Sequence, residues 1–284
     1  MDITDISGTT KLSNGVEMPV LGLGVYKARE GREVVQSIQH AFEAGYRHID
    51  TAFFYKNEKG VGEAVRASGL PREEVFITTK VWNDDQGYEH TLAAFDKSLE
   101  ELGMDYIDLY LIHWPVPGKY LETWKALEKL YSEGKLKAIG VSNFLEHHLN
   151  DILNNFSIVP MVLQNEFHPR LVQQPLLDFC KKNNIQYESW SPLMRGEVFK
   201  LDTLKELAEK YHKTIAQVVI RWNLQKGVVT IPKSVHRDRI FENAAVFDFL
   251  ISEEDMHKID ALDQEERTGA DPDDFMDHFR DSDS

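Results

Sequence analysis

VFITTKVWNDDQGYEHTLAAFDKSLEELGMDYIDLYLIH, residues 75–113, contains two apolar runs with an amphipathic segment between them. The two runs, at 75–80 and 106–113, are rich in Val, Ile and Tyr, and the second is nearly continuously apolar, which is typical of strands buried on both faces of a parallel sheet. The segment between them, 87–103, ends in Gly103, a residue favoured at helix C-termini, and has apolar side chains on one helical face: Leu92, Phe95, Leu99 and Leu102. The stretch therefore predicts a strand, a helix and a second, parallel strand.

The same alternation continues along the chain, with a further helix at 121–134. Eight strands are predicted, at 20–24, 46–50, 75–80, 106–113, 137–142, 161–165, 185–190 and 228–232. This pattern indicates a single α/β domain, 1–284, folded as a (β/α)8 TIM barrel. An Asn14-Gly15 turn predicts an N-terminal β-hairpin. After the eighth strand we expect a helix at 237–249 and an extra C-terminal helix opened by Ser252.

A doubly wound dinucleotide-binding fold is the alternative architecture. It requires the pattern GxGxxG between a strand and a helix. Gly22-Leu-Gly24 is followed by Val25, Tyr26 and Lys27 without the third glycine, and Gly60-Val-Gly62 fails in the same way. The barrel is therefore favoured.

Composition narrows the class of protein. The net charge of −15 argues against nucleic acid and anionic membranes as partners, and no apolar run approaches 18 residues. The start of the chain has no secretory signal pattern, and Cys180 is the one cysteine and is expected to be buried in a helix. These features predict a cytoplasmic monomer. Much of the negative charge lies in an acidic C-terminal tail at about 268–284, which is expected to be mobile.

Four chemically active residues follow consecutive predicted strands. Asp50 ends the second strand, Tyr55 lies in the loop after it, Lys80 ends the third strand and His113 ends the fourth. Alone, each would more often be structural, for example a turn former or a surface lysine. Because the carboxyl ends of barrel strands meet at one mouth, we expect the four side chains to converge there.

This set of side chains suits the reduction of a carbonyl group. Hydride transfer builds negative charge on the carbonyl oxygen, so a nearby acid must supply a proton. A phenol has a pKa of about 10, and a neighbouring ammonium is expected to lower the pKa of Tyr55. Asp50 can pair with Lys80, and His113 can orient the carbonyl by a hydrogen bond. No HExxH or similar ligand spacing occurs, so no metal is expected.

The hydride donor is expected on the same rim. Barrels often hold phosphate in the loops after strands seven and eight, where the chain carries Lys233, Arg237 and Arg239. Trp190 ends strand seven and can stack on a flat ring. The basic cluster therefore suits the extra phosphate of NADP.

The chain resembles the aldo-keto reductases over nearly its whole length. The matching segments are LSNGVEMPVLGLGVY (12–26), GYRHIDTAFFYKNE (45–58), VFITTKVW (75–82), DYIDLYLIHWP (105–115), AIGVSNF (138–144), WSPLM (190–194) and IPKSVHRDRIFENAAVFDF (231–249). The resemblance is strongest to short bacterial and protozoan members, such as 2,5-diketogluconate reductases, methylglyoxal-type reductases and prostaglandin F synthases. It implies NADPH-dependent reduction of aldehydes and ketones.

The resemblance also implies a role for each site residue. Tyr55 would be the general acid, supported by Lys80, Asp50 and His113. Ser142, Asn143 and Gln164 would hold the nicotinamide carboxamide, and Trp190 would stack on its ring. The other implied cofactor contacts are Ser191, Leu193, Lys233, Ser234, Val235, Arg239, Glu242 and Asn243, and the implied substrate-pocket residues are Tyr26, Trp82, His113 and Trp114.

Three departures from the family pattern stand out. Leu163 and Asn165 flank Gln164 where Asn and an apolar residue are usual, Tyr26 replaces a common Trp, and the tail reads TGADPDDF instead of containing GPDP. The connection 113–120 is short, which predicts an open pocket with broad, weak selectivity.

Two other functions stay open on the sequence. The first is a non-catalytic member of the same fold that binds NADPH and acts as a regulatory or structural subunit. The second is a barrel isomerase or aldolase that uses Lys80 as a Schiff-base nucleophile, which would leave Tyr55 and the cofactor segment unexplained.

Overall fold

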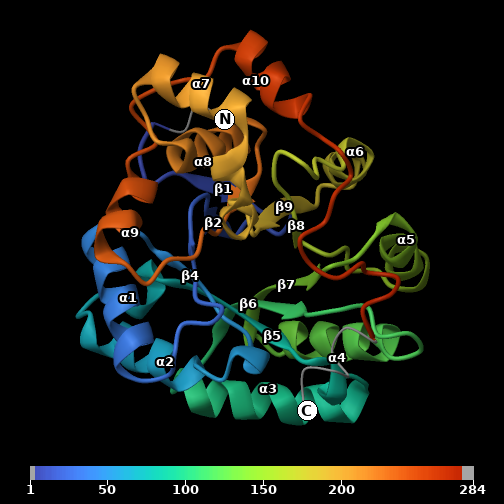
Figure 1. The fold of residues 1–284 in the computed structure, drawn as a ribbon. Helices are drawn as coiled ribbons and strands as arrows, with labels where there is room; N and C mark the ends of the chain where they lie inside the picture. The colour runs from blue at the N-terminus through green and yellow to red at the C-terminus, as the bar shows by residue number, and fades with distance from the viewer. Residues whose placement is uncertain (1–3, 277–284) are drawn as a thin grey trace.

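The protein, described by a computed structural model over residues 4–276, is a barrel of parallel strands surrounded by helices (Figure 1). The eight-stranded sheet runs in the order β10-β9-β8-β7-β6-β5-β4-β3. Backbone hydrogen bonds from Gly22 to Thr230 (3.0 Å) and from Thr230 to Val20 (3.1 Å) close the ring between its ends. The strands are β3 (Leu23–Gly24), β4 (His48–Asp50), β5 (Phe76–Val81), β6 (Ile107–Ile112), β7 (Leu136–Ser142), β8 (Val162–Glu166), β9 (Gln186–Trp190) and β10 (Val229–Thr230).

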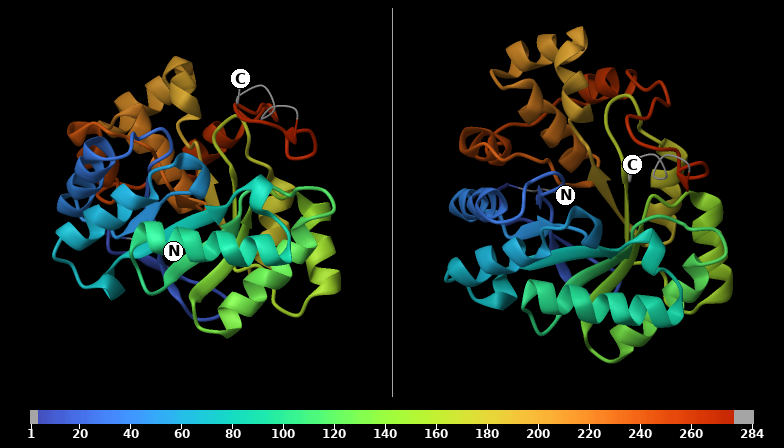
Figure 2. Two further views of the ribbon diagram at one scale, coloured as in Figure 1. Left: turned by 90° about the horizontal axis from the view of Figure 1, so that it is seen from below. Right: turned by 60° about the horizontal axis from the view of Figure 1, so that its bottom comes forward.

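The helices lie outside this ring, as the two further views show (Figure 2). They are α1 (Arg32–Glu43), α2 (Glu58–Ala67), α3 (Tyr88–Leu102), α4 (Tyr120–Ser132), α5 (Glu146–Asn155), α6 (Gln174–Lys182), α7 (Asp202–Tyr211), α8 (Ile215–Gln225), α9 (Arg237–Ala244) and α10 (Glu253–Asp260). A hairpin of β1 (Thr9–Lys11) and β2 (Glu17–Pro19) precedes the barrel. Among the described residues, no helix is long and apolar enough to cross a membrane.

The predicted barrel is confirmed, and each predicted strand overlaps an observed one. Two of the predicted helix ends are confirmed by their geometry. Gly103 adopts φ 62° at the C-terminal end of α3. The Ser252 hydroxyl accepts a hydrogen bond from the backbone N–H of Asp255 at 3.3 Å at the start of α10. Cys180 is buried in α6, as expected.

The helix predicted at 237–249 is too long, because α9 ends at Ala244. The Gln217 side chain of α8 donates to the carbonyls of Glu242 (3.1 Å) and Ala245 (3.0 Å), which satisfies acceptors at the end of the helix. Val246 then packs fully buried in the core. Tertiary contacts that local sequence does not encode therefore end the helix.

The first part of the predicted mobile tail is held against the barrel, which corrects that expectation for residues 268–276. The buried Glu166 carboxylate accepts hydrogen bonds from the backbone N–H groups of Thr268 (2.7 Å) and Gly269 (3.1 Å). Phe275 is buried and stacks on Trp114, with 4.9 Å between ring centroids. The rest of the predicted acidic tail, 277–284, lies outside the described residues.

Asp273 also holds the C-terminal segment 268–276 against α5. Its Oδ1 lies 3.0 Å from Nε2 of His147 and 3.5 Å from Nε2 of His148, and these three residues also have the proximity of metal ligands. The backbone N–H of Leu145 donates to Nδ1 of His148 (3.2 Å), which places the proton of the neutral ring on Nε2. Burial lowers the pKa of His148 to about 4, so its ring is neutral, with Nε2 facing Asp273.

Candidate active site

The four residues predicted at the barrel mouth do converge there. Lys80, at the end of β5, is fully buried and donates from Nζ to Asp50 Oδ1 at 2.7 Å and to the carbonyl of Thr51 at 2.8 Å. Its Nζ also lies 3.5 Å from the hydroxyl oxygen of Tyr55, which sits in η1 (Phe53–Tyr55) after β4. A carboxylate, an ammonium and a phenol thus form a continuous chain that ends at a cavity.

The expectation that Lys80 lowers the pKa of Tyr55 is wrong for the protein without ligands. Burial, and to a smaller extent the charge of Asp50, raise the pKa of Tyr55 well above 10. The expectation weighed one neighbouring ammonium and left out desolvation. The phenol is therefore protonated at neutral pH, which is the form that can donate a proton.

His113 completes this end of the cavity in its neutral form. Burial and the charge of Lys80 lower the pKa of His113 well below 6.5, so the ring carries a single proton. Among the described residues, no group hydrogen-bonds to its buried Nδ1. Trp82 packs edge-on against the ring at 5.1 Å between centroids and stacks on Phe54 at 3.9 Å. The result is an apolar wall beside a neutral hydrogen-bond donor.

Two amides near the site already have internal partners. The Asn143 side chain donates to the carbonyl of His113 at 2.9 Å and accepts from the indole N–H of Trp190 at 2.9 Å. Gln164 uses its Nε2 to donate to the carboxyl groups of Asp50 (2.7 Å) and Glu188 (2.9 Å). Asn143 therefore fixes the indole of Trp190, whereas Gln164 keeps its carbonyl oxygen available to a ligand.

A cavity of about 820 Å³ extends from these residues across the carboxyl ends of the strands. Most residues predicted for the site line it: Tyr26, Asp50, Tyr55, Trp82, His113, Trp114, Ser142, Asn143, Gln164, Trp190, Ser191, Leu193, Lys233, Ser234, Arg239, Glu242 and Asn243. Lys80 and Val235 are not in the lining. Lys80 is buried behind Asp50 and Tyr55, and the Val235 side chain packs against the core.

The far end of this cavity is basic and exposed. Lys233 and Arg239 line it from the segment after β10 and from α9. Arg237, the third member of the predicted basic cluster, instead lies 3.5 Å from Glu43 and over the ring of Phe241. Only part of the sequence cluster therefore faces the cavity.

Sequence reasoning missed several lining residues. Lys27 and Arg195 add positive charge, and Phe199 adds an apolar surface that is 48% exposed. Gly269 and Ala270 enter the lining from the C-terminal segment. The cation next to Tyr26 was a visible signal, whereas the others come from the segment after β9 and from the C-terminal segment, whose positions depend on contacts distant in the sequence.

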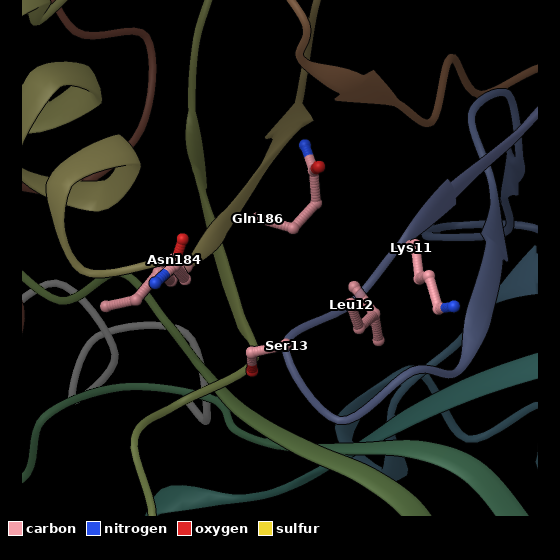
Figure 3. A pocket seen from close by; sticks show the side chains of 6 residues that line it. Lys11, Leu12, Ser13, Asn184 and Gln186 are labelled. Carbon is pink, nitrogen blue, oxygen red and sulfur yellow. The ribbon is translucent and has the colours of Figure 1, made fainter.

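A second, smaller cavity of about 360 Å³ lies at the other end of the strands, between the hairpin and the start of β9 (Figure 3). Its lining side chains come from 11–13 and 184–186. The amide of Gln186 is already engaged there, because it accepts from Thr10 at 2.9 Å and donates to the carbonyl of Gly227 at 2.9 Å. The amide of Gln186 therefore serves the structure of this end of the barrel.

The unusual residues beside Gln164 fit their surroundings. Leu163 is fully buried in the core, and the Asn165 side chain donates to the carbonyl of Phe144 at 2.8 Å. Both unusual residues are therefore accommodated on either side of Gln164 in the middle of β8.

Comparison with known proteins decides the family. The model of the Aldo/keto reductase family matches residues 20–264. The chain belongs to the aldo/keto reductase family. It is 59% identical over 273 residues to the glyoxal reductase of Bacillus subtilis (strain 168), covering 96% of this chain and 99% of that protein. It is 57% identical over 268 residues to the 9,11-endoperoxide prostaglandin H2 reductase of Trypanosoma cruzi (strain CL Brener), covering 93% and 95%.

A solved structure of the family is similar in shape. A mutant of Gox0644 in complex with NADPH superposes with a TM-score of 0.90 at 44% identity, covering 94% of this chain and 98% of that chain. The predictions of the family, of the reductase class and of NADP(H) as the cofactor are thus confirmed at the level of the family.

Proposed function

We propose that the protein reduces small aldehydes and dicarbonyls to alcohols with NADPH as the cofactor. The observation that carries this proposal is the chain from Asp50 through Lys80 to Tyr55, which ends in a protonated phenol at the large cavity. A relative named glyoxal reductase, 59% identical over nearly the full length, supports a small carbonyl substrate.

The cavity suits a nicotinamide dinucleotide with a 2′-phosphate. One end offers the flat indole of Trp190 and the available carbonyl oxygen of Gln164, which match an aromatic ring with a carboxamide N–H. The other end offers Lys233 and Arg239, which match phosphate groups. An aromatic surface and basic side chains in the lining of one cavity are the combination expected for NADPH.

When bound, NADPH supplies the hydride. Tyr55 gives its phenolic proton to the carbonyl oxygen of the substrate, and Lys80 stabilises the phenolate that remains. Asp50 holds Lys80 in position through the 2.7 Å ion pair. Neutral His113 donates a hydrogen bond to the same oxygen and orients it.

The remaining contacts are proposed from the residues that line the cavity and from the family resemblance. Gln164 accepts from the carboxamide, while Asn143 acts mainly by holding the indole of Trp190. The other proposed cofactor residues are Ser142, Ser191, Leu193, Lys233, Ser234, Arg239, Glu242 and Asn243, with Val235 limited to its backbone.

The substrate end of the cavity supports broad selectivity. Tyr26 is 42% exposed and packs against Tyr55, with 4.9 Å between ring centroids, and Trp82 and Trp114 form the rest of this surface. The connection after His113 is short, and although Phe275 of the C-terminal segment covers Trp114, the ring of Tyr26 stays exposed. We therefore expect small aldehydes and dicarbonyls to be reduced without strong discrimination. A single domain, a monomeric state and a cytoplasmic location are further proposals that rest on composition and pattern.

The decisive experiment is a substrate panel with NADPH and NADH in parallel, following the absorbance of the reduced cofactor. Several small aldehydes and dicarbonyls should be turned over with similar kcat/KM, and NADPH should be preferred. Exclusive turnover of one bulky ketone would contradict broad selectivity. Tight NADPH binding without any turnover would favour a non-catalytic, regulatory member of the fold instead.

A Schiff-base enzyme is disfavoured by the surroundings of Lys80. Its ammonium is fully buried and bonded to both Asp50 and the carbonyl of Thr51, so it lacks the free amine that a nucleophile needs. Borohydride trapping of a carbonyl substrate on Lys80 would reverse this conclusion.

A further inference from the structure

A second carboxyl group lies buried behind the proposed catalytic residues. Glu188, in the middle of β9, is fully buried and accepts a hydrogen bond at 2.9 Å from the same Gln164 nitrogen that donates to Asp50. Each amide hydrogen of Gln164 is thus directed at a carboxyl group. The two contacts fix which way this amide points, and they leave its oxygen for the cavity.

The charges around Glu188 do not balance if every carboxyl group is ionised. Asp50 and His48 face it from β4, Lys80 faces it from β5, and Tyr55 interacts with it from the mouth. Burial lowers the pKa of His48 to about 3, so this ring is neutral although its Nε2 lies 3.7 Å from Glu188 Oε1. Within the described residues, Lys80 is therefore the cation shared by two buried carboxyl groups.

We propose that Glu188 is a positioning residue for the reduction and that it works as a neutral carboxylic acid. In this form it holds Gln164 in the orientation that the cofactor needs, and it leaves the negative charge of Asp50 to pair with Lys80. The proposal deepens the function proposed above and rests on it.

The distribution of contacts decides which of the two carboxyl groups keeps the proton. Asp50 has the direct ion pair with Lys80 at 2.7 Å, whereas Glu188 Oε1 has no hydrogen-bond partner among the described residues. Two adjacent carboxyl groups in a dry site cannot both ionise easily. Burial raises the pKa of both carboxyl groups. At Asp50 the charge of Lys80 is the main opposing effect, whereas at Glu188 the charge of Asp50 adds to burial and the pKa rises to about 8.

Ionisation of Glu188 should harm the reaction. A second negative charge behind Asp50 would raise the pKa of Tyr55 further, because an ionised Glu188 acts on the phenol in the same direction as Asp50. The phenolate left after proton delivery would then be less stable, so the reduction should slow as pH rises through the pKa of Glu188. Replacement by glutamine keeps a neutral group of the same shape that can accept from Gln164.

The first test measures stability and does not depend on turnover. A carboxyl group whose pKa is raised on folding stabilises the native state only while protonated, so its contribution falls as pH rises from the unfolded to the folded pKa. Glu188→Gln should therefore gain free energy of unfolding relative to wild type between about pH 5 and pH 8, measured by urea denaturation. A difference that is constant over this range would overturn the proposal even if the protein is an active reductase.

The second test is kinetic and separates positioning from general structure. For Glu188→Gln, the decline of kcat with rising pH should move to higher pH than in wild type. Glu188→Ala should raise the KM for NADPH by about two- to tenfold through the lost hydrogen bond to Gln164, and glutamine should restore most of it. An unmoved pH profile in the glutamine variant would show that Glu188 does not titrate in the reaction.

A third measurement covers the case in which both variants fail to fold. In wild-type protein labelled at the glutamate side-chain carboxyl carbon, NMR should show a glutamate that stays protonated at pH 7. Glu58 is the matched control, because it is also a buried carboxyl group with a raised pKa but bonds to Thr79 and Ser98 instead of Gln164. If Glu58→Gln removes every signal that titrates above pH 7, Glu188 is ionised and the proposal is wrong.

Discussion

The two ends of the large cavity are built differently. At the catalytic end, Asp50 and Lys80 project from strands, are buried and already bond to each other. At the basic end, Lys233 and Arg239 come from the segment after β10 and from α9, and both are exposed. The charged groups of the first end are buried and paired with each other, whereas those of the second end are on exposed side chains. Chemistry at the catalytic end should therefore tolerate far less change than binding at the basic end.

The largest effect on rate is expected from Tyr55→Phe, which removes the proposed proton donor and leaves the ring in place. Loss of a general acid costs about 10²- to 10⁴-fold, so kcat should fall by that range. The Kd for NADPH, measured by fluorescence titration, should stay close to that of wild type. Equal losses of rate and NADPH affinity would show that Tyr55 organises the cavity rather than supplying the proton.

Lys80→Met should produce the largest loss of stability. It leaves the Asp50 carboxylate buried without its cation, and breaking such a pair costs about 3–5 kcal/mol. Lys233→Met is the matched control at the basic end, where an exposed charge contributes about 0–1 kcal/mol. Urea denaturation of both variants measures the contrast directly. Similar losses of stability in the two variants would show that the buried end is no more sensitive to the loss of a charge than the exposed end.

Arg239→Ala should act on the choice of cofactor rather than on folding. If its guanidinium binds the 2′-phosphate, its loss removes a hydrogen bond to a charged group, worth about 1.5–3 kcal/mol. The Kd for NADPH should then rise about ten- to 150-fold, while that for NADH changes little. Isothermal titration with both cofactors checks this, and equal weakening of both would place the phosphate contact elsewhere.

The same contrast explains what the sequence could predict. Asp50, Lys80 and His113 stand at or beside the ends of β4, β5 and β6, and strand ends follow from local apolar runs. Barrel geometry then brings these ends together, so their convergence could be inferred without coordinates. The direction of the pKa shift of Tyr55 could not, because it depends on burial by the whole site.

Long-range contacts account for the other misses. Glu166 bonds to Thr268 across 102 residues of chain, so no local pattern indicated that the C-terminal segment would form part of the cavity wall. Glu188 is visible in the sequence as a charged residue within the strand-like run IQYESW at 185–190. A charge in a buried strand of a barrel is a useful signal, since it must have a partner or lose its charge.

Gly269→Ala is expected to have the smallest effect and tests whether the docked C-terminal segment sets the position of Trp190. A Cβ at residue 269 would lie 2.5 Å from the indole ring and 3.3 Å from the Glu166 carboxylate, so the ring must shift. An aromatic contact is worth about 0.5–1.5 kcal/mol, so cofactor affinity should fall about two- to tenfold with either NADPH or NADH. Trp190 is proposed to bind the ring that both cofactors share, whereas Arg239 is proposed to bind the 2′-phosphate that NADH lacks. The equal effect on both cofactors therefore distinguishes this variant from Arg239→Ala. An unchanged Kd for both cofactors would show that the indole can move without a loss of cofactor affinity. The C-terminal segment would then line the cavity without setting the affinity for the cofactor.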